Sequence, residues 1–140
     1  MATTYTATKA ASTYPARAGV GLTTVFHTYT PSSALVINDV IQMVKVPVGA
    51  TIVDMILATQ DLDSNGAPAI SLAVGDGGST SRFISSSTVA RTGGVTFLNQ
   101  EGGFLYNYTT EDTIDVIVLA APATWQSGSI GLIVTYTMEQ

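Results

Sequence analysis

The sequence predicts an all-β fold, an antiparallel β-sandwich of jelly-roll-like topology preceded by an extended N-terminal arm. Three observations support this fold class. Segments rich in β-branched and aromatic residues follow one another along the chain. Clusters of Gly, Pro, Asn and Asp separate these segments at spacings typical of sandwiches and barrels. No window shows the 3.6-residue apolar stripe of an amphipathic helix.

The beginning of the chain differs from the rest, because residues 1–19 are rich in Thr, Ala and Ser and show no strand or helix period. We therefore expect residues 1–19 to be an arm and residues 20–140 to be the sandwich domain. A chain of 140 residues suits one such domain. The expected strands are Gly21–Tyr29, Ser33–Val46, Thr51–Gln60, Ala69–Val74, Arg82–Ser86, Val95–Leu98, Phe104–Tyr108, Ile114–Ala120 and Ser129–Met138.

The last of these strands has the clearest alternation, because Ile130, Leu132 and Val134 fall on one face. That face should belong to the core. The second and third expected strands are apolar on both faces. They should be central in a sheet or covered by another subunit.

Composition narrows the possible partners. Charged residues make up 11% of the chain, whereas about 25% is usual, so much of the surface is expected to be covered by other subunits. Five basic and 10 acidic residues give a formal net charge of −5, which argues against nucleic acid as a partner. The sequence has no cysteine and no apolar run long enough for a membrane helix, so we expect neither disulfides nor a membrane partner.

One segment contains half of a calcium-binding loop. Oxygen-bearing side chains alternate in Asp61–Gly66, and the glycine permits a sharp turn. The carboxylate that should complete the loop falls instead on Leu72. We therefore expect a hydrogen-bonded turn at this segment and no metal site.

The sequence contains no convincing catalytic motif. His27 is the only histidine, and no Gly-x-Ser-x-Gly elbow accompanies it. Glu101, Glu111, Asp112 and Asp115 could in principle supply the paired carboxylates of a glycosidase. Glu111 and Asp112 are expected in a turn between two strands, and Asp115 should face outward from its strand. We expect no catalytic residues, no cofactor and no enzymatic activity.

Several short motifs, taken together, resemble a known group of proteins. They are Val46–Ala50, Leu72–Gly77, Arg82–Ile84, Gly103–Tyr108 and Gly128–Val134. In this order they resemble small virion proteins of tailed bacteriophages that are encoded among the head genes. The resemblance covers roughly residues 46–138, about two thirds of the chain.

The resemblance implies a capsid cement or decoration protein, in which jelly-roll-like subunits, commonly trimers, bind the major capsid protein on the outer shell. Such a protein is made in the bacterial host cytoplasm and ends up on the capsid surface of the virion. The resemblance also implies that Arg82, Tyr106 and Tyr108 stabilise the sandwich. The N-terminal arm, residues 1–19, matches nothing in this group.

Three aromatic residues are the candidates for partner binding. We expect the arm to order along a neighbouring subunit or capsid protein, anchored by Tyr5 and Tyr14. Trp125 is the third candidate, because an exposed aromatic ring can bind a partner. Two alternatives remain open: a glycan- or receptor-binding module of a phage fibre or tail, and a head-completion or tail protein.

Overall fold

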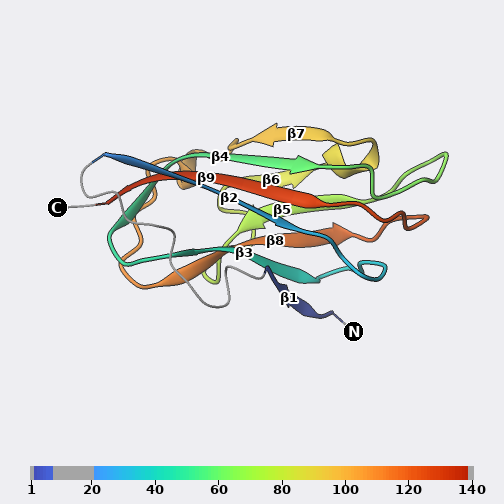
Figure 1. Cartoon of the computed structure of the whole chain (residues 1–140), viewed down its shortest axis with the longest axis horizontal. Coiled ribbons are helices and arrows are strands. Elements are labelled where there is room, and N and C mark those ends of the chain that lie inside the picture. Colours follow the sequence, from blue (N-terminus) through green and yellow to red (C-terminus); the bar gives the residue numbers. More distant parts are fainter. Residues whose placement is uncertain (1, 8–20, 139–140) are drawn as a thin grey trace.

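The computed structural model describes residues 2–7 and 21–138, and the strands form two sheets packed face to face (Figure 1). The strands are β1 (Thr4–Thr6), β2 (Leu22–Tyr29), β3 (Val40–Val46), β4 (Ala50–Thr59), β5 (Ser71–Gly75), β6 (Ile84–Ser87), β7 (Gly94–Phe97), β8 (Asp112–Ala120) and β9 (Ile130–Met138). Two 3₁₀ turns, η1 (Val89–Arg91) and η2 (Glu101–Gly103), flank β7. Within the described ranges, no helix is long and apolar enough to cross a membrane.

The two sheets have the strand orders of a jelly roll. One sheet has five strands in the order β1-β3-β8-β5-β6, and the other has four in the order β2-β9-β4-β7. Strands β2 to β9 pair with one another only in the antiparallel direction. From β2 onward the chain changes sheet at every connection except the one between β5 and β6. This is the double Greek-key arrangement. The all-β sandwich predicted from the sequence is therefore confirmed.

The core lies between the sheets and is built by the alternation of β9 and its partners. Ile130, Leu132, Val134 and Tyr136 are each at most 2% exposed, as the sequence predicted for this face. In register with them across β4 lie buried residues such as Leu57. Each sheet thus buries one face, which provides most of the hydrophobic stabilisation.

Bulges explain why two strands looked apolar on both faces. In β3 the register shifts between Gln42 and Val44, so the adjacent residues Met43 and Val44 are both fully buried. In β4 the register shifts between Ile52 and Asp54. Both strands also lie inside their sheets rather than at an edge, as expected.

Two expected strands are shorter than predicted or absent. The strand expected at Ser33–Val46 begins only at Val40, because a turn with Asn38 at φ 70° precedes it. The strand expected at Phe104–Tyr108 does not form. Leu105 has φ 60° there, and this left-handed backbone is incompatible with a continuous strand.

The beginning of the expected arm contributes to the sandwich. β1 pairs parallel with β3, and Ala7 is 1% exposed within the core. Asp39 holds this segment, because its Oδ1 accepts a hydrogen bond from the Thr3 amide at 2.6 Å and its Oδ2 accepts one from the Val36 amide at 2.9 Å. Residues 8–19 of the expected arm lie outside the described residues, so the boundary between arm and sandwich stays a prediction.

Candidate interaction surfaces

Two of the three aromatic residues expected to bind a partner lie among the described residues. Tyr5 is in β1, and its ring packs against that of Tyr29 with centroids 5.9 Å apart. Trp125 is in the loop between β8 and β9 and lies half-buried against the core. Tyr14 is outside the described residues. Their roles in partner binding stay predictions.

Asp63 organises the loop with the calcium-like pattern, Asp61–Gly66. This residue is only 1% exposed. Its two carboxylate oxygens accept five backbone hydrogen bonds at 2.7–3.3 Å, from the amides of Asn65, Ala69, Ile70, Ala123 and Thr124. Burial alone would raise the pKa of Asp63, but these amides outweigh it and hold the pKa well below its usual range. The carboxylate thus joins the loop after β4 to the loop after β8.

The other oxygens of this loop form local turns. Asp61 Oδ1 accepts a hydrogen bond from the Asp63 amide at 2.9 Å, and Asn65 Oδ1 accepts one from the Ala67 amide at 2.9 Å. These are Asx turns, which the sequence favoured over a calcium site. In residues 2–7 and 21–138, no group of three or more His, Cys, Asp or Glu side chains is arranged to hold a metal ion.

The residues that the resemblance assigned to stabilising the sandwich meet around Asp76. Arg82 Nε and Nη2 donate to the two Asp76 oxygens at 2.6 and 3.1 Å, and the Tyr108 hydroxyl donates to Asp76 Oδ2 at 2.8 Å. The Arg82 guanidinium also lies 3.9 Å from the centre of the Tyr106 ring, which contacts Tyr108 edge to face. These residues therefore fix the loop after β5 to the segment before β8.

The charges inside this cluster are matched. Burial would raise the pKa of Asp76, but the Arg82 and Tyr108 hydrogen bonds hold it below its usual value. Burial, together with the bond to Asp76, raises the pKa of the Tyr108 hydroxyl far above its ordinary value. Asp76 is thus ionised and Tyr108 neutral at any ordinary pH. The cluster holds the fold together, and its polar atoms are occupied by one another.

The acidic residues considered for glycosidase chemistry have separate roles. Glu101 is exposed in η2, and Glu111 pairs with Lys45 at 3.3 Å between strand ends. Asp112 accepts a hydrogen bond from the Gly77 amide at 3.2 Å. Asp115 is buried. These placements match structural roles in turns and ion pairs.

Asp115 corrects a sequence expectation. It lies on the sheet face opposite Ile114 and Val116, as predicted, but it is only 7% exposed and its Oδ1 has no hydrogen-bond partner. Its β5 register partner is Gly75, against which the backbone of Ser79 is packed. Burial raises the pKa of Asp115 to about 7. The hydrogen bond from Thr113 opposes this rise, while the charges of Asp112 and Asp76 add to it.

The outer face of the four-stranded sheet carries a row of apolar side chains in direct register. The row crosses β2, β9, β4 and β7 as Phe26, Ile133, Ile56 and Phe97. Phe26 and Phe97 are each 58% exposed, and the two isoleucines are half-buried between them. We call these four residues the apolar row. They form the best-defined candidate docking surface of the described chain.

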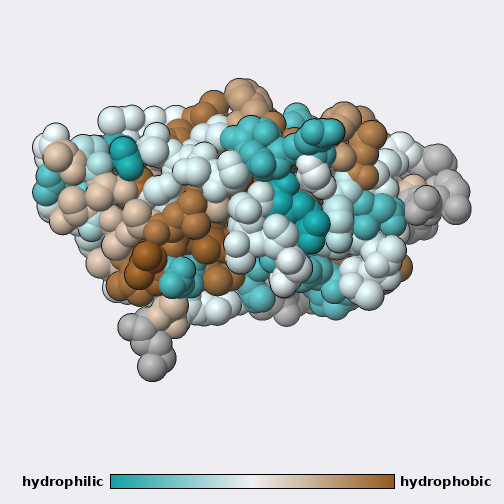
Figure 2. All heavy atoms as spheres, turned by 180° about the vertical axis from the view of Figure 1, so that it is seen from behind, coloured by the Kyte–Doolittle hydropathy of each residue, from teal (hydrophilic) through white to brown (hydrophobic). Residues whose placement is uncertain are grey.

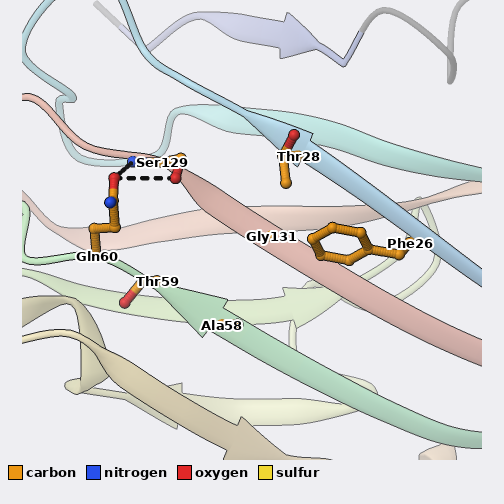
Figure 3. Close-up of a pocket in the computed structure, with 7 residues that line it drawn as sticks. All are labelled: Phe26, Thr28, Ala58, Thr59, Gln60, Ser129 and Gly131. Carbon is orange, nitrogen blue, oxygen red and sulfur yellow. Dashed lines mark hydrogen bonds between the residues drawn. The ribbon is translucent and has the colours of Figure 1, made fainter.

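A shallow hollow adjoins the apolar row on the same face (Figure 3). Its volume is about 200 Å³, and its lining includes Phe26, Thr28, Ala58 and Gly131. Gly131 creates the space, since a Cβ there would lie 2.9 Å from Phe26 Cε1. The register Thr28, Gly131, Ala58 and Val95 forms a second row beside the first.

Apolar side chains are also exposed near the other sheet. Ile37 is 56% exposed and Leu119 is 37% exposed. Their chain neighbours are hydrogen-bonded to each other, because the Asn38 amide donates to the Val118 carbonyl. Figure 2, which views the molecule from behind relative to Figure 1, shows a brown apolar area toward one end of that face. Both outer faces of the sandwich therefore expose apolar side chains.

Sequence reasoning did not identify the apolar row. Phe26 and Phe97 are 71 positions apart in the numbering (97 minus 26), and only the pairing of four strands brings them into one line. The exposure of Phe26 on the face opposite Val25 was visible as alternation along one strand. The matching register in the other strands left no local signal.

The comparisons connect this fold with bacteriophage capsids. A chain of the capsid of Ralstonia phage GP4 superposes with a TM-score of 0.87 and 27% identity, covering 98% of this chain and 99% of that one. A chain of the cyanophage Pam1 capsid superposes with a TM-score of 0.78 and 29% identity, covering 94% and 98%. By structural similarity, this is a phage capsid structural protein.

A more distant match shows the fold alone. A chain of the capsid of Helicobacter pylori bacteriophage KHP30 has a TM-score of 0.56 and 18% identity, covering 86% of this chain and 95% of that one. No family model and no curated protein matches the capsid protein described here. The similarity therefore rests on structure over nearly the full length, together with the 27% and 29% identities.

Proposed function

We propose that this capsid protein is a cement or decoration protein, which binds the outer surface of a bacteriophage head and stabilises it. The observation that carries the proposal is the similarity to chains of the GP4 and Pam1 capsids over at least 94% of the sequence. A small sandwich with few charges, and with apolar side chains exposed on both sheets, suits a subunit that is added to a shell and partly covered there.

The proposed partners are the major capsid protein and other copies of this chain, with a trimer as the favoured assembly. An interface of ordinary size, about 800 Å² per partner, is enough to cover one apolar face of a sandwich. The proposed location is the capsid surface of the virion, after synthesis in the host bacterial cytoplasm. No cofactor, nucleic acid or membrane is required for this role.

A non-enzymatic role is part of the proposal. The polar clusters around Asp63 and Asp76 are closed, because backbone amides, Arg82 and Tyr108 occupy the carboxylate oxygens. The apolar row offers dispersion contacts rather than proton transfer.

The test compares phage particles that carry or lack this protein. We expect cryo-electron microscopy to show density on the outside of the shell at many sites in the first sample and none in the second. Particles lacking the protein should release their DNA at a lower temperature. Density confined to a single vertex would instead indicate a head-completion or tail protein, and binding in a glycan array without binding to shells would indicate a receptor-binding module.

The same assay tests the proposed anchors. Tyr14→Ala and Trp125→Ala should each lower the occupancy of depleted shells, because aromatic side chains dominate many interfaces. Tyr5→Ala also removes the contact with Tyr29, so its melting temperature must be measured alongside. Thr110→Ala, at an exposed position, is the matched control. Unchanged occupancy with all three aromatic variants would refute their role as anchors.

A further inference from the structure

The apolar row has an internal symmetry. Read across the four strands, it runs Phe26, Ile133, Ile56 and Phe97, so the same residue types appear from either end. In a two-fold contact between identical chains, residue i of one copy meets residue j of the other, and the same contact is repeated with the copies exchanged. Across the middle of this row, such a contact sets Phe against Phe and Ile against Ile. The pattern points to a second copy of this chain as the occupant.

Charge on this face also favours a second copy. Across all residues of β2, β4, β7 and β9, Asp54 is the only Asp, Glu, Lys or Arg. The whole chain has a formal net charge of −5, so two copies repel one another over most approaches. The four strands themselves add one acidic side chain per copy to this repulsion.

The hollow beside the row supplies the matching shape. Rotating one copy about an axis parallel to the strands, between β9 and β4, places Phe26 against Phe97 of the other copy. The same rotation places Val95 of the other copy over Thr28, next to Gly131. A hollow of about 200 Å³ can accept an aliphatic side chain. Val95 of one copy therefore faces the space that Gly131 leaves on the other.

We propose that two copies of this chain pack through the outer faces of their four-stranded sheets, about a two-fold axis that sets Phe26 of each against Phe97 of the other. This contact goes beyond the proposed cement role and is separate from a trimer contact. Strands about 4.8 Å apart and about 26 Å long give a face of roughly 500 Å². Because stable interfaces bury about 800 Å² per partner, we expect micromolar rather than nanomolar association.

The test uses sedimentation equilibrium of the full chain from about 1 μM to about 1 mM. We expect Phe26→Lys and Phe97→Glu each to weaken association at least about tenfold. Both side chains are 58% exposed, so the variants should keep the wild-type melting temperature and circular dichroism. The double variant F26K/F97E should recover association, because each lysine then faces a glutamate. Val48→Lys, 57% exposed in the turn between β3 and β4, is the control and should leave association unchanged.

Several results would overturn the two-fold contact. One is a chain that stays monomeric at about 1 mM, even if it binds shells through this face. Another is a trimer insensitive to both single substitutions, which would leave the cement role intact. A third is failure of the double variant to recover association, since an axis that sets Phe26 against Phe26 gives like charges at both contacts.

Discussion

Asp63 and Asp115 are both more than nine-tenths buried, yet they are stabilised in opposite ways. Five backbone amides donate to Asp63, and its pKa lies well below the usual range. Asp115 has one oxygen without a partner, and its pKa is raised to about 7. The first site keeps its charge by supplying donors, and the second reduces the cost of burial by taking up a proton.

This difference gives the two sites opposite pH dependences. A lowered pKa means that Asp63 contributes stability above its ordinary value near 3.8, and that this contribution is lost as the pH falls through the folded-state pKa. A raised pKa means that the stability associated with Asp115 is complete below about pH 3.8 and is lost as the pH rises through about 7. Because the Asp63 contribution is complete above about pH 3.8 and the Asp115 contribution falls above that value, the two sites together favour maximum stability near pH 4.

The largest effect should come from the site that keeps its charge. Asp63→Ala leaves five amides without their acceptor and separates the loops that follow β4 and β8. We expect it to lower the melting temperature more than any other substitution considered for stability, as measured by differential scanning calorimetry. Asp54→Ala, at an exposed aspartate in β4, is the control. Equal effects of the two would contradict the role assigned to the amides.

A smaller loss should follow from breaking the ion pair at Asp76. Arg82→Ala removes both of its hydrogen bonds to Asp76 and the contact with Tyr106. The carboxylate stays buried with only Tyr108 and amides as donors, so urea denaturation should show a loss of about 3 kcal/mol. Lys45→Ala, which breaks a half-exposed ion pair with Glu111, should cost less than about 1 kcal/mol. A comparable loss from both would show that burial does not strengthen the Arg82 pair.

The sequence could predict the parts of this molecule that depend on neighbouring residues. The alternation of β9 and the turns between strands follow from side-chain period and backbone preference, and these predictions are confirmed. The resemblance also identified Arg82, Tyr106 and Tyr108, which the structure brings together. Their acceptor, Asp76, lies within the motif Leu72–Gly77, but the motif alone does not indicate its role.

Features that depend on long-range pairing escaped prediction. β1 pairs with β3, and Asp39, 36 positions after Thr3, accepts the Thr3 amide. No local sequence pattern reports contacts at this separation. The Met43–Val44 bulge removes the alternation on which strand faces are assigned. Asp115 looked like a surface residue because alternation gives the face on which a residue lies, whereas its burial depends on what packs over that face.

A still smaller effect than that of Arg82→Ala is expected at Asp115. It distinguishes the two carboxyl sites most directly, because it should appear at high pH and vanish at low pH. Asp115→Asn replaces a group that is neutral below about pH 7 with one that is neutral throughout. At pH near 4 the variant and the wild type should unfold alike. At pH near 8 the wild type holds a desolvated carboxylate beside Asp112 and Asp76, so the variant should be more stable by roughly 2 kcal/mol after allowance for solvent screening.

Urea denaturation at the two pH values measures this difference, and carboxyl ¹³C titration by NMR gives the pKa of Asp115 directly. Asp112→Asn is the matched control, because it removes one neighbouring charge and should lower the pKa of Asp115 without abolishing its titration. A variant that is equally stabilised or destabilised at both pH values would show that Asp115 is ionised, or neutral, throughout. The unpaired Oδ1 of Asp115 would then destabilise the fold by the same amount at every pH. Asp63 and Asp115 would differ only in the number of amides that donate to each carboxylate.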